Sequence, residues 1–281
     1  MFGSAFRYAT RYPGRAARAL ARDPFGAWET FHDRLVQRRE YRGGPCRYEI
    51  SPDWDQELHS ALGQAWPCTA AQEFRTIWPG VIEAVECAGI NVGPESFNGF
   101  NDGDTALVRA IWCLTRHLRP CHVVETGVAH GFTSRGILEA LARNGAGHLS
   151  SIDRAPLDPV MRRHIGIAVA DRSRWTLIDG SSRRRLPGLL AQLGQIGLFV
   201  HDSLHTQRNL GFELDYAWTH LEPGGALVID DLDTNWGFRS FTHAHPGHLA
   251  LVCEAEPVRP DARRFNGKGL FGIVLKNGEA S

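Results

Sequence analysis

The stretch Val123–Thr133, VVETGVAHGFT, decides how this chain folds. Apolar residues lead to an acid, Glu125, and then to a turn that contains Gly127 and Gly131. Glycine lets the backbone bend sharply and approach a ligand closely. Residues 133–143, TSRGILEALAR, have helical spacing. The turn therefore joins a buried strand to a helix whose first N–H groups point toward a ligand.

The same alternation of strand and helix continues to the end of the chain. It indicates parallel β–α–β units, and we predict an α/β fold with a doubly wound, mostly parallel, seven-stranded sheet. Ligands of such sheets bind outside the carboxyl ends of the strands. A helix over 206–221 is expected to stop at residues 222–225, EPGG. The predicted strands are 122–127, 148–153, 175–180, 196–203, 226–231, 249–256 and 270–276.

The first hundred residues lack this strand spacing. They contain tryptophans, prolines and short helical patterns such as the one over 23–40. We therefore divide the chain into a helical N-terminal extension or lid, residues 1–100, and a ligand-binding domain, residues 101–281. Asp104 is the expected N-cap of a helix over 105–118.

Composition limits the class of partner. The chain has 31 basic and 31 acidic residues. No net field attracts a phosphate backbone, and we predict no nucleic-acid partner. No stretch reaches the ~18 consecutive apolar residues that span a bilayer, so we predict no stable membrane insertion. The 6 scattered cysteines form no Cys-x-x-Cys pair. This favours reduced thiols in a cytoplasmic protein.

The N-terminal arm is rich in arginine and has no acid in its first 22 residues. We interpret it as a helix or arm that packs on the domain or on a partner subunit, in a homodimer or larger homo-oligomer. A transit peptide or a membrane-surface helix is the alternative. The arginines are Arg7, Arg11, Arg15, Arg18 and Arg22.

The acid at the first strand end indicates which ligand the glycine turn binds. Glu125 would repel the pyrophosphate of a dinucleotide, and the turn lacks the G-x-G-x-x-G pattern of such sites. The sulfonium and amino groups of S-adenosylmethionine are cationic, so the acid favours this ligand over NAD. Asp153, at the next strand end, can accept hydrogen bonds from ribose hydroxyls. The third strand end is expected beside the adenine. The predicted cofactor-binding residues are Glu125, Gly127, Gly131, Thr133, Ser134, Asp153, Asp179, Gly180 and Ser181.

A second polar group ends the fourth and fifth strands. HDSLH supplies Asp202 and His205, and IDDLD supplies Asp230 and Asp231. Crowded carboxylates repel one another unless a cation neutralises them. Oxygen ligands favour Mg²⁺, Mn²⁺ or Ca²⁺, and no cysteine pair or His-x-x-x-His spacing supports zinc. The alternative is a set of solvated loop aspartates, one of which caps the following helix.

Other residues near these strand ends receive weaker assignments. His201 should point to the face opposite Asp202, which favours a core role. Trp236 either walls the acceptor pocket or packs in the core. Residues 242–248, THAHPGH, are expected to form a polar loop on the substrate side.

These motifs resemble class I S-adenosylmethionine-dependent methyltransferases over residues 104–276. VVETGVAHGFTSRGILEAL, SSID, LFVHDSLH and LEPGGALVIDDLDTN carry the resemblance, with Ala129 where many members have glycine. It implies a Rossmann-like methyltransferase sheet. The Asp-x-x-His unit with Asp-Asp is similar to the metal-dependent macrolide-sugar O-methyltransferases and the cephalosporin-hydroxylase-like group. That resemblance implies magnesium ligands at Asp202, Asp230 and Asp231, and His205 as the base.

The sequence thus predicts an enzyme that methylates a hydroxyl of a small polyol, sugar or catechol-like acceptor. Asp202 and His205 are the predicted catalytic residues, and the cofactors are S-adenosylmethionine and Mg²⁺, or Mn²⁺ or Ca²⁺ in its place. A bound cation lowers the pKa of the acceptor hydroxyl, and a histidine removes its proton near neutrality. Three alternatives stay open: a metal-independent methyltransferase with His205 as base, a nucleoside-binding protein without transferase activity, and a nicotinamide oxidoreductase.

Overall fold

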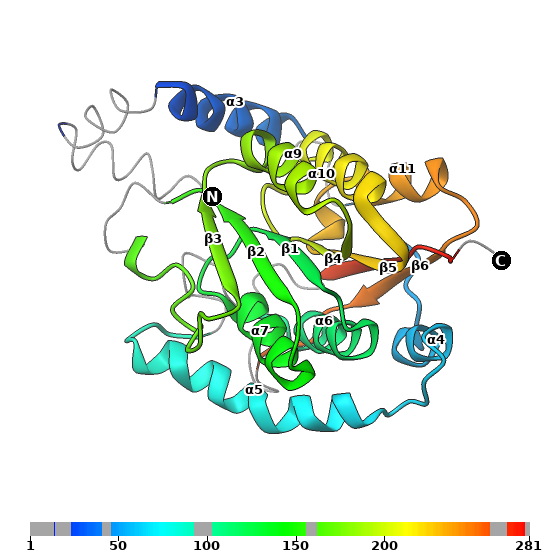
Figure 1. Ribbon diagram of the computed structural model, residues 1–281. Helices are drawn as coiled ribbons and strands as arrows, with labels where there is room; N and C mark the ends of the chain where they lie inside the picture. The colour runs from blue at the N-terminus through cyan, green and yellow to red at the C-terminus, as the bar shows by residue number, and fades with distance from the viewer. Residues whose placement is uncertain are drawn as a thin grey trace.

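A seven-stranded sheet runs through the molecule in the order β3-β2-β1-β4-β5-β7-β6 (Figure 1). Its strands are β1 (His122–Thr126), β2 (His148–Asp153), β3 (Trp175–Asp179), β4 (Ile196–His201), β5 (Leu221–Ile229), β6 (Leu249–Glu254) and β7 (Leu270–Leu275). β1 to β5 are parallel, and β7 is antiparallel to both of its neighbours. The predicted mostly parallel, doubly wound sheet is confirmed. The computed structural model describes residues 14, 24–40, 46–92, 103–155, 162–258 and 269–278.

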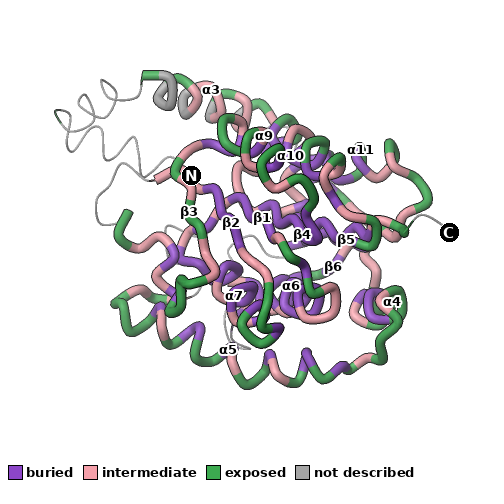
Figure 2. Tube along the Cα trace, in the orientation of Figure 1, coloured by how far each residue is buried: buried purple, intermediate pink, exposed green. Residues whose placement is uncertain are grey.

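Helices cover both faces of the sheet, as Figure 1 shows. One face packs against α4 (Trp54–Ala61), α6 (Thr105–Leu118) and α7 (Phe132–Asn144). The other packs against α9 (Ser182–Leu193), α10 (Gln207–His220) and α11 (Gly237–Ala244). The central strands β1 and β4 are almost continuously buried (Figure 2), as expected for parallel strands covered on both faces. The edge strands β3 and β6 are partly exposed.

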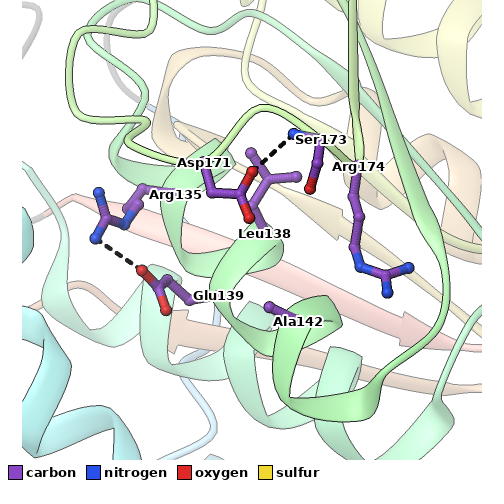
Figure 3. Close-up of a pocket in the computed structure, with 7 residues that line it drawn as sticks. All are labelled: Arg135, Leu138, Glu139, Ala142, Asp171, Ser173 and Arg174. Carbon is purple, nitrogen blue, oxygen red and sulfur yellow. Dashed lines mark hydrogen bonds and ion pairs between the residues drawn. The ribbon is translucent and has the colours of Figure 1, made fainter.

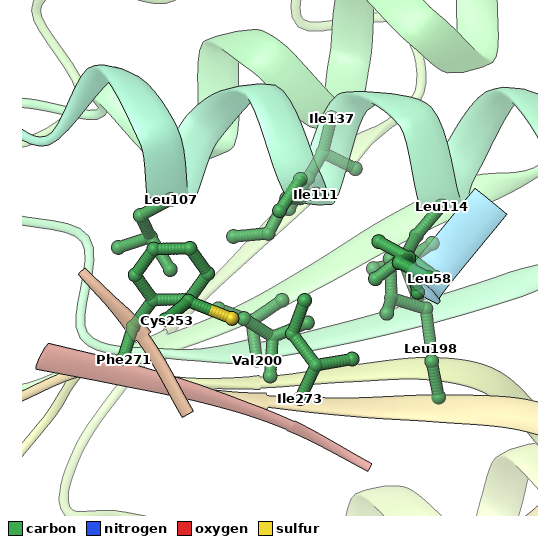
Figure 4. Packing of buried hydrophobic residues seen from close by; sticks show 14 of the residues in the cluster. Leu58, Leu107, Ile111, Leu114, Ile137, Leu198, Val200, Cys253, Phe271 and Ile273 are labelled. Atoms are coloured by element: carbon green, nitrogen blue, oxygen red, sulfur yellow. The ribbon is translucent and has the colours of Figure 1, made fainter. Parts of the chain in front are cut away.

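Strand alternation divides the apolar side chains between these two layers. In β4, Leu198 and Val200 join the core under α6, whereas Phe199 joins the core under α9 and α10. Figure 4 shows the first of these cores, in which Ile111 of α6 and Ile273 of β7 belong to the same cluster as Leu198 and Val200. Successive strand residues face opposite sides, so a short apolar run supplies both layers at once.

The described part of the first hundred residues is helical. α3 (Pro24–Glu40) lies on the side of α9 and α10, and α5 (Thr69–Cys87) lies on the opposite side, outside α6 (Figure 1). Trp54 and Leu58 of α4 belong to the same core cluster as the strands. This segment therefore adds apolar cover to the sheet, while its separation into a lid over residues 1–100 stays a prediction.

The N-cap of α6 is confirmed. Asp104 has extended backbone angles, and its Oδ1 accepts hydrogen bonds from the N–H groups of Ala106 and Leu107. The same oxygen accepts from Glu256 N. A cap of this kind satisfies helix N–H groups that have no partner within the helix. It also ties the start of α6 to the segment after β6.

Several predicted boundaries are wrong by a few residues. β5 begins at Leu221, so the EPGG segment belongs to the strand, and its end at Ile229 leaves Asp230 and Asp231 in the following loop. Leu221 pairs with Ile196 of β4, and the register shifts before Leu198. This pairing offsets the low strand propensity of Pro and Gly.

Three further predictions concern surface and ends. The predicted loop over 242–248 starts inside α11, which extends to Ala244. All 6 cysteines are free thiols, in agreement with the reduced state predicted. Within the described ranges, no helix is long and apolar enough to cross a membrane. The arginine-rich arm lies outside the described residues.

Candidate functional site

The carboxyl ends of β1, β2, β3 and β4 surround a cavity of about 380 Å³. Its wall includes Gly127, Asp153, Ser181 and Asp202, one from the end of each strand. Small-molecule sites commonly have a volume of ~300–1,000 Å³. The cavity therefore lies where a doubly wound sheet binds its ligand and has the size for one.

The glycine turn forms the floor of this cavity. Gly127, Ala129 and Gly131 all have positive φ, at 85°, 46° and 86°. A Cβ on Gly127 would come within 1.8 Å of the Asp202 carbonyl oxygen, so only glycine fits there. Ala129 adopts the left-handed region although it has a side chain, which is uncommon outside Asn, Asp and Gly. The turn is thus tightly bent and pressed against the end of β4.

Asp153 holds the turn from the neighbouring strand. Its Oδ2 accepts hydrogen bonds from Val128 N at 3.0 Å and Ala129 N at 3.1 Å. Burial raises the pKa of this carboxyl, and the backbone hydrogen bonds oppose the rise. Asp153 also lines the cavity. It therefore joins the turn to the cavity wall, and its predicted contact with a ribose stays a prediction.

Glu125 lies behind the turn and does not line the cavity. It is fully buried, and its Oε2 accepts hydrogen bonds from Ser134 Oγ at 2.7 Å and Ser151 Oγ at 2.6 Å. Burial raises its pKa to about 7, against the effect of the two serines. Thr133, at the start of α7, is also buried. The predicted ligand contacts of Glu125, Thr133 and Ser134 stay predictions, and the structure places these side chains beneath the floor.

The end of β3 supplies one side wall. Gly180 and Ser181 line the cavity, while Asp179 turns away and accepts a hydrogen bond from Ala155 N at 3.0 Å. Ser181 Oγ lies 3.0 and 3.1 Å from the two carboxylate oxygens of Glu29. A residue of α3 therefore contacts the predicted adenine side.

α3 covers one edge of the cavity. The sequence did not predict the position of this helix. Asp33 and Gln37, one turn apart on this helix, line the cavity together with the residues of the strand ends. Arg154, just after β2, lies 3.5 Å from both Glu29 and Asp33. The predicted lid therefore has a described segment beside the cavity, although its closure stays a prediction.

The predicted catalytic residues lie close together after the ends of β4 and β5. His205 Nε2 lies 3.7 Å from Asp202 Oδ1 and 3.6 Å from Asp231 Oδ2. Asp230 is close enough to hydrogen-bond the Asp202 carboxyl. The side chains of His205, Asp202 and Asp231 are 14%, 29% and 33% exposed, so an acceptor can reach all three.

The electrostatics of this group favour a positive ligand. Burial, with repulsion from Asp231, raises the pKa of Asp202 well above its ordinary value. The same two causes raise the pKa of Asp230. Burial lowers the pKa of His205, although Asp231 opposes this. A bound cation would relieve the repulsion between these carboxylates.

The donor set suits a hard divalent cation in its chemistry, since carboxylates are the ligands that Mg²⁺, Mn²⁺ and Ca²⁺ prefer. In the described part of the chain, the oxygens of Asp202, Asp230 and Asp231 are not all within 4.8 Å of one another. A cation held by all three would draw their side chains together. Asp231, with φ of 54°, is held by its backbone at the start of the short helix η3 (Leu232–Thr234).

Glu213 of α10 supports this corner from below, and sequence reasoning missed it. It is fully buried and lies 2.6 Å from His201 Nδ1. It also accepts hydrogen bonds from Thr126, Ser203 and Asn209. Burial acts to raise its pKa, but His201 and the hydrogen bonds outweigh this and lower it to about 2. This explains the core role predicted for His201.

The predicted acceptor wall at Trp236 is partly exposed. Its ring is 37% exposed and lies 5.3 Å from the ring of Tyr48, whose hydroxyl donates to the Asn235 carbonyl at 2.8 Å. Cys46 N donates to Asp233 O at 2.8 Å. The segment after α3 therefore braces the loop that carries Trp236.

A shallow second cavity of about 60 Å³ lies on the outside of α7 (Figure 3). Its charged groups all have partners: Arg135 pairs with Glu139 at 2.7 Å, Asp171 accepts from Ser173 N at 2.8 Å, and Arg174 donates to the carbonyls of Gly145 and Gly147. Its volume is far below the ~300–1,000 Å³ of small-molecule sites. It holds no reactive group and is not a candidate active site.

Comparison with known proteins agrees with this geometry. The model of a methyltransferase domain matches residues 124–232. A Klebsiella pneumoniae protein classed by name with the O-methyltransferases has a similar structure, with a TM-score of 0.50 and 17% identity over 80% of this chain and 96% of that one. Cofactor-bound Rv0187 from MTB gives a TM-score of 0.51 at 16% identity over 83% of this chain and 100% of that one. No curated protein matches the sequence. The resemblance to class I methyltransferases is confirmed.

Proposed function

We propose that this chain, which carries a class I methyltransferase domain, transfers a methyl group from S-adenosylmethionine to a hydroxyl oxygen of a small polyol, sugar or catechol-like acceptor. One observation carries the proposal. The cavity that begins at the glycine turn ends at Asp202, and Asp202 lies 3.7 Å from His205, the group suited to act as base. Donor and acceptor sites are therefore adjacent.

The donor half is formed by Gly127, Asp153, Gly180 and Ser181. Gly127 allows the ligand to approach the backbone, and the free face of the Asp153 carboxyl can accept from ribose hydroxyls. Gly180 and Ser181 are at the adenine side. Glu125 acts from behind the floor, where an ionised carboxylate would favour the cationic sulfonium.

The acceptor half supplies the proton transfer. Since the pKa of His205 is lowered by burial, its imidazole is neutral at pH 7 and can accept the proton of the acceptor hydroxyl on Nε2. The oxygen then forms the new O–CH₃ bond as the S–CH₃ bond breaks. The electron pair of the broken S–CH₃ bond stays on sulfur, and S-adenosylhomocysteine is the product. Asp202 and Asp231, at 3.7 and 3.6 Å from Nε2, stabilise the resulting imidazolium.

A divalent cation at Asp202, Asp230 and Asp231, with magnesium the first choice, is part of the proposal. When bound, it would lower the pKa of the acceptor hydroxyl. The raised pKa values of Asp202 and Asp230 support a cation there. A metal-independent reaction with His205 as base is the alternative.

The remaining features of the proposal concern partners and location. A small-molecule acceptor is consistent with a cavity of about 380 Å³. The net charge of zero supports the absence of a nucleic-acid partner. We also propose a cytoplasmic location and retain a homodimer or larger homo-oligomer as the assembly to test by sedimentation.

The test separates the two halves with two isosteric variants of the full chain. Calorimetry with S-adenosylmethionine and S-adenosylhomocysteine measures donor binding, and S-adenosylhomocysteine release across a panel of polyols, sugars and catechols measures transfer. We expect Asp202→Asn to bind the donor like the wild type and to lose transfer. Asp153→Asn should bind the donor at least ~10-fold more weakly, since charged hydrogen bonds contribute ~1.5–3 kcal/mol.

Several outcomes would refute parts of this scheme. Transfer that survives both Asp202→Asn and EDTA would exclude the metal. A chelator-insensitive wild type with an inactive His205→Ala variant would favour the metal-independent reaction. Donor binding without product across the panel would indicate a nucleoside-binding protein, and binding of NAD(H) instead would indicate an oxidoreductase.

A further inference from the structure

Sulfur and nitrogen ligands lie close together where α4, the start of α5 and α6 meet. His59 belongs to α4, Cys68 is the N-cap of α5, and Cys113 belongs to α6. One ligand atom from each lies within 4.8 Å of the other two. The three residues are 1%, 6% and 0% exposed. Such a buried gathering of two thiols and an imidazole needs a chemical explanation.

A fourth ligand joins the group from the last turn of α6. His117 follows Cys113 by four residues, so both lie on one face of the helix. His117 Nε2 is 3.3 Å from Cys68 Sγ. The rings of His59 and His117 are 5.6 Å apart at an angle of 88°. The ligand atoms of His59, Cys68 and Cys113 are all within 4.8 Å of one another, and His117 would move inward from its contact with Cys68 to complete a set of two cysteines and two histidines.

Two distances within this set are close to the edge lengths of a tetrahedral site. Zinc binds sulfur at ~2.3 Å and nitrogen at ~2.0–2.1 Å, which puts neighbouring sulfurs ~3.8 Å apart and a nitrogen ~3.6 Å from a sulfur. The Cys68 and Cys113 sulfurs are 3.9 Å apart. The contact between His117 and Cys68, at 3.3 Å, is also near an edge length. Both sulfurs are free thiols in the structure.

The surroundings orient the ligands as those of metal sites are oriented. His59 Nδ1 is 2.7 Å from the Asp55 carbonyl, to which it donates, and this leaves Nε2 with a lone pair. That Nε2 is buried and has no hydrogen-bond partner among the described residues. Ala71 N donates to Cys68 Sγ at 3.2 Å. Metal-bound histidines commonly donate their other N–H to a carbonyl or a carboxylate, and a buried unpaired nitrogen is costly without a ligand.

We propose that His59, Cys68, Cys113 and His117 bind a zinc ion. Two thiolates and two imidazoles suit zinc and disfavour magnesium or calcium. Four protein ligands leave no open position, so the ion is structural. α6 runs directly into the start of β1, so Cys113 and His117 lie toward the end of the sheet opposite the catalytic cavity. The ion joins α4 and the start of α5 to α6, and thereby fixes the N-terminal helices on the sheet.

The experiment measures metal in the full chain, purified under reducing conditions without chelator from zinc-supplemented cells. Elemental analysis should find about one zinc ion per chain in the wild type. His59→Gln and Cys113→Ser should each lose most of it. Cys87→Ser and Cys121→Ser change exposed cysteines and should retain it. Asp202→Asn should retain it as well, which distinguishes this site from the acidic cluster.

Cobalt replacement provides a second readout that does not depend on variants. Reduced, zinc-free protein with cobalt(II) should show a thiolate charge-transfer band and strong visible bands of tetrahedral cobalt. A strong zinc chelator should lower the melting temperature of the wild type by at least ~5 °C, an effect that Cys113→Ser should abolish.

If these variants fail to fold, the metal content and cobalt spectrum of the wild type decide. A wild type that contains no zinc and binds none when reduced would overturn the proposal. A disulfide between Cys68 and Cys113 in protein purified under non-reducing conditions, with no metal uptake after reduction, would also overturn it. Copper in place of zinc would reject the assigned ion.

Discussion

Glu125 in β1 and Glu213 of α10, which contacts the end of that strand, are both fully buried, yet their carboxyl groups meet opposite environments. Two serine hydroxyls contact Glu125, and burial raises its pKa to about 7. Burial acts on Glu213 too, but His201, 2.6 Å away, and hydrogen bonds from Ser182 and Thr126 lower its pKa to about 2. Glu125 lies under the proposed donor half of the site, and Glu213 contacts Ser203 and Asn209 on the side of the proposed acceptor half.

The comparison teaches that burial alone does not set the charge of these acids. A buried carboxylate is stable only where a cation and enough hydrogen-bond donors replace water. Glu213 accepts hydrogen bonds from Thr126, Ser203 and Asn209 and contacts His201, so its charged form is favoured and it holds the turn after β4. Glu125 has no cationic partner in the described structure, so its charge is available to a cationic ligand.

The largest effect should follow from removing the base of the acceptor half. His205→Ala should lower the rate of methyl transfer by ~10²–10⁴, the usual contribution of general base catalysis, with the donor affinity unchanged. Initial rates and calorimetry on the same preparations measure both. The exposed His243→Ala variant serves as control. A parallel loss of donor affinity would show that the two halves are not separate.

Replacing Glu213 by a neutral residue should lower the free energy of unfolding. Glu213→Gln removes a carboxylate that contacts His201 and accepts from Thr126, Ser203 and Asn209, and each buried donor left unsatisfied costs ~1–3 kcal/mol. Since the folded pKa is about 2, below the ordinary 4.5, this stability is present above pH 4.5 and is lost as the pH falls toward 2. Urea unfolding at pH 7 and pH 3 measures it.

The difference between wild type and Glu213→Gln should therefore shrink at the lower pH. Glu83→Gln, at an exposed position of α5, is the matched control and should change little. Equal losses at both pH values would show that Glu213 stabilises the fold by packing and not by charge.

Glu125 should give the opposite dependence on pH. Its folded pKa of about 7 is above the ordinary 4.5, so its favourable contribution is full below pH 4.5 and is lost as the pH rises through 7. Glu125→Gln should unfold at a higher temperature than the wild type at pH 8 and at nearly the same temperature at pH 4.5. Scanning calorimetry without ligand measures this. Parallel curves for the two proteins would contradict the assigned shift.

The smallest effect is expected at the edge that α3 covers. Ser181→Ala removes the hydroxyl that donates to Glu29 and should weaken donor binding by about 2- to 10-fold, the value of one ordinary hydrogen bond. Calorimetry measures the affinity, with Ser60→Ala, at an exposed position, as control. Unchanged affinity would mean that α3 does not close on the donor.

The sequence predicted the sheet well because each strand has a local signal. The run of apolar residues before Glu125 and the glycines after it are adjacent in the chain, and so are Asp202 and His205. The start of β5 was wrong because Pro223 and Gly224 disfavour a strand locally, while pairing with β4 extends it.

Residues that act across long separations were not predictable. Glu213 has the appearance of any polar helix residue until His201 folds against it. Glu29 contacts Ser181 across 152 positions. Cys113 and His117 carry a helical i, i+4 spacing, but their partners come from two other helices. Tertiary packing brings these groups together, and local sequence patterns do not predict such contacts.

Gly127 and the Asp202 carbonyl bring two segments of the backbone into contact with no side chain between them. A side chain between them could change rotamer and so vary their separation. Two backbone segments in direct contact have no such freedom and are displaced together. Thermal motion should therefore displace the methyl donor and the acceptor in concert, and the in-line path between sulfur and oxygen is preserved. Variation in acceptor choice must then come from segments such as the one around Trp236, because this spacing has no room to change.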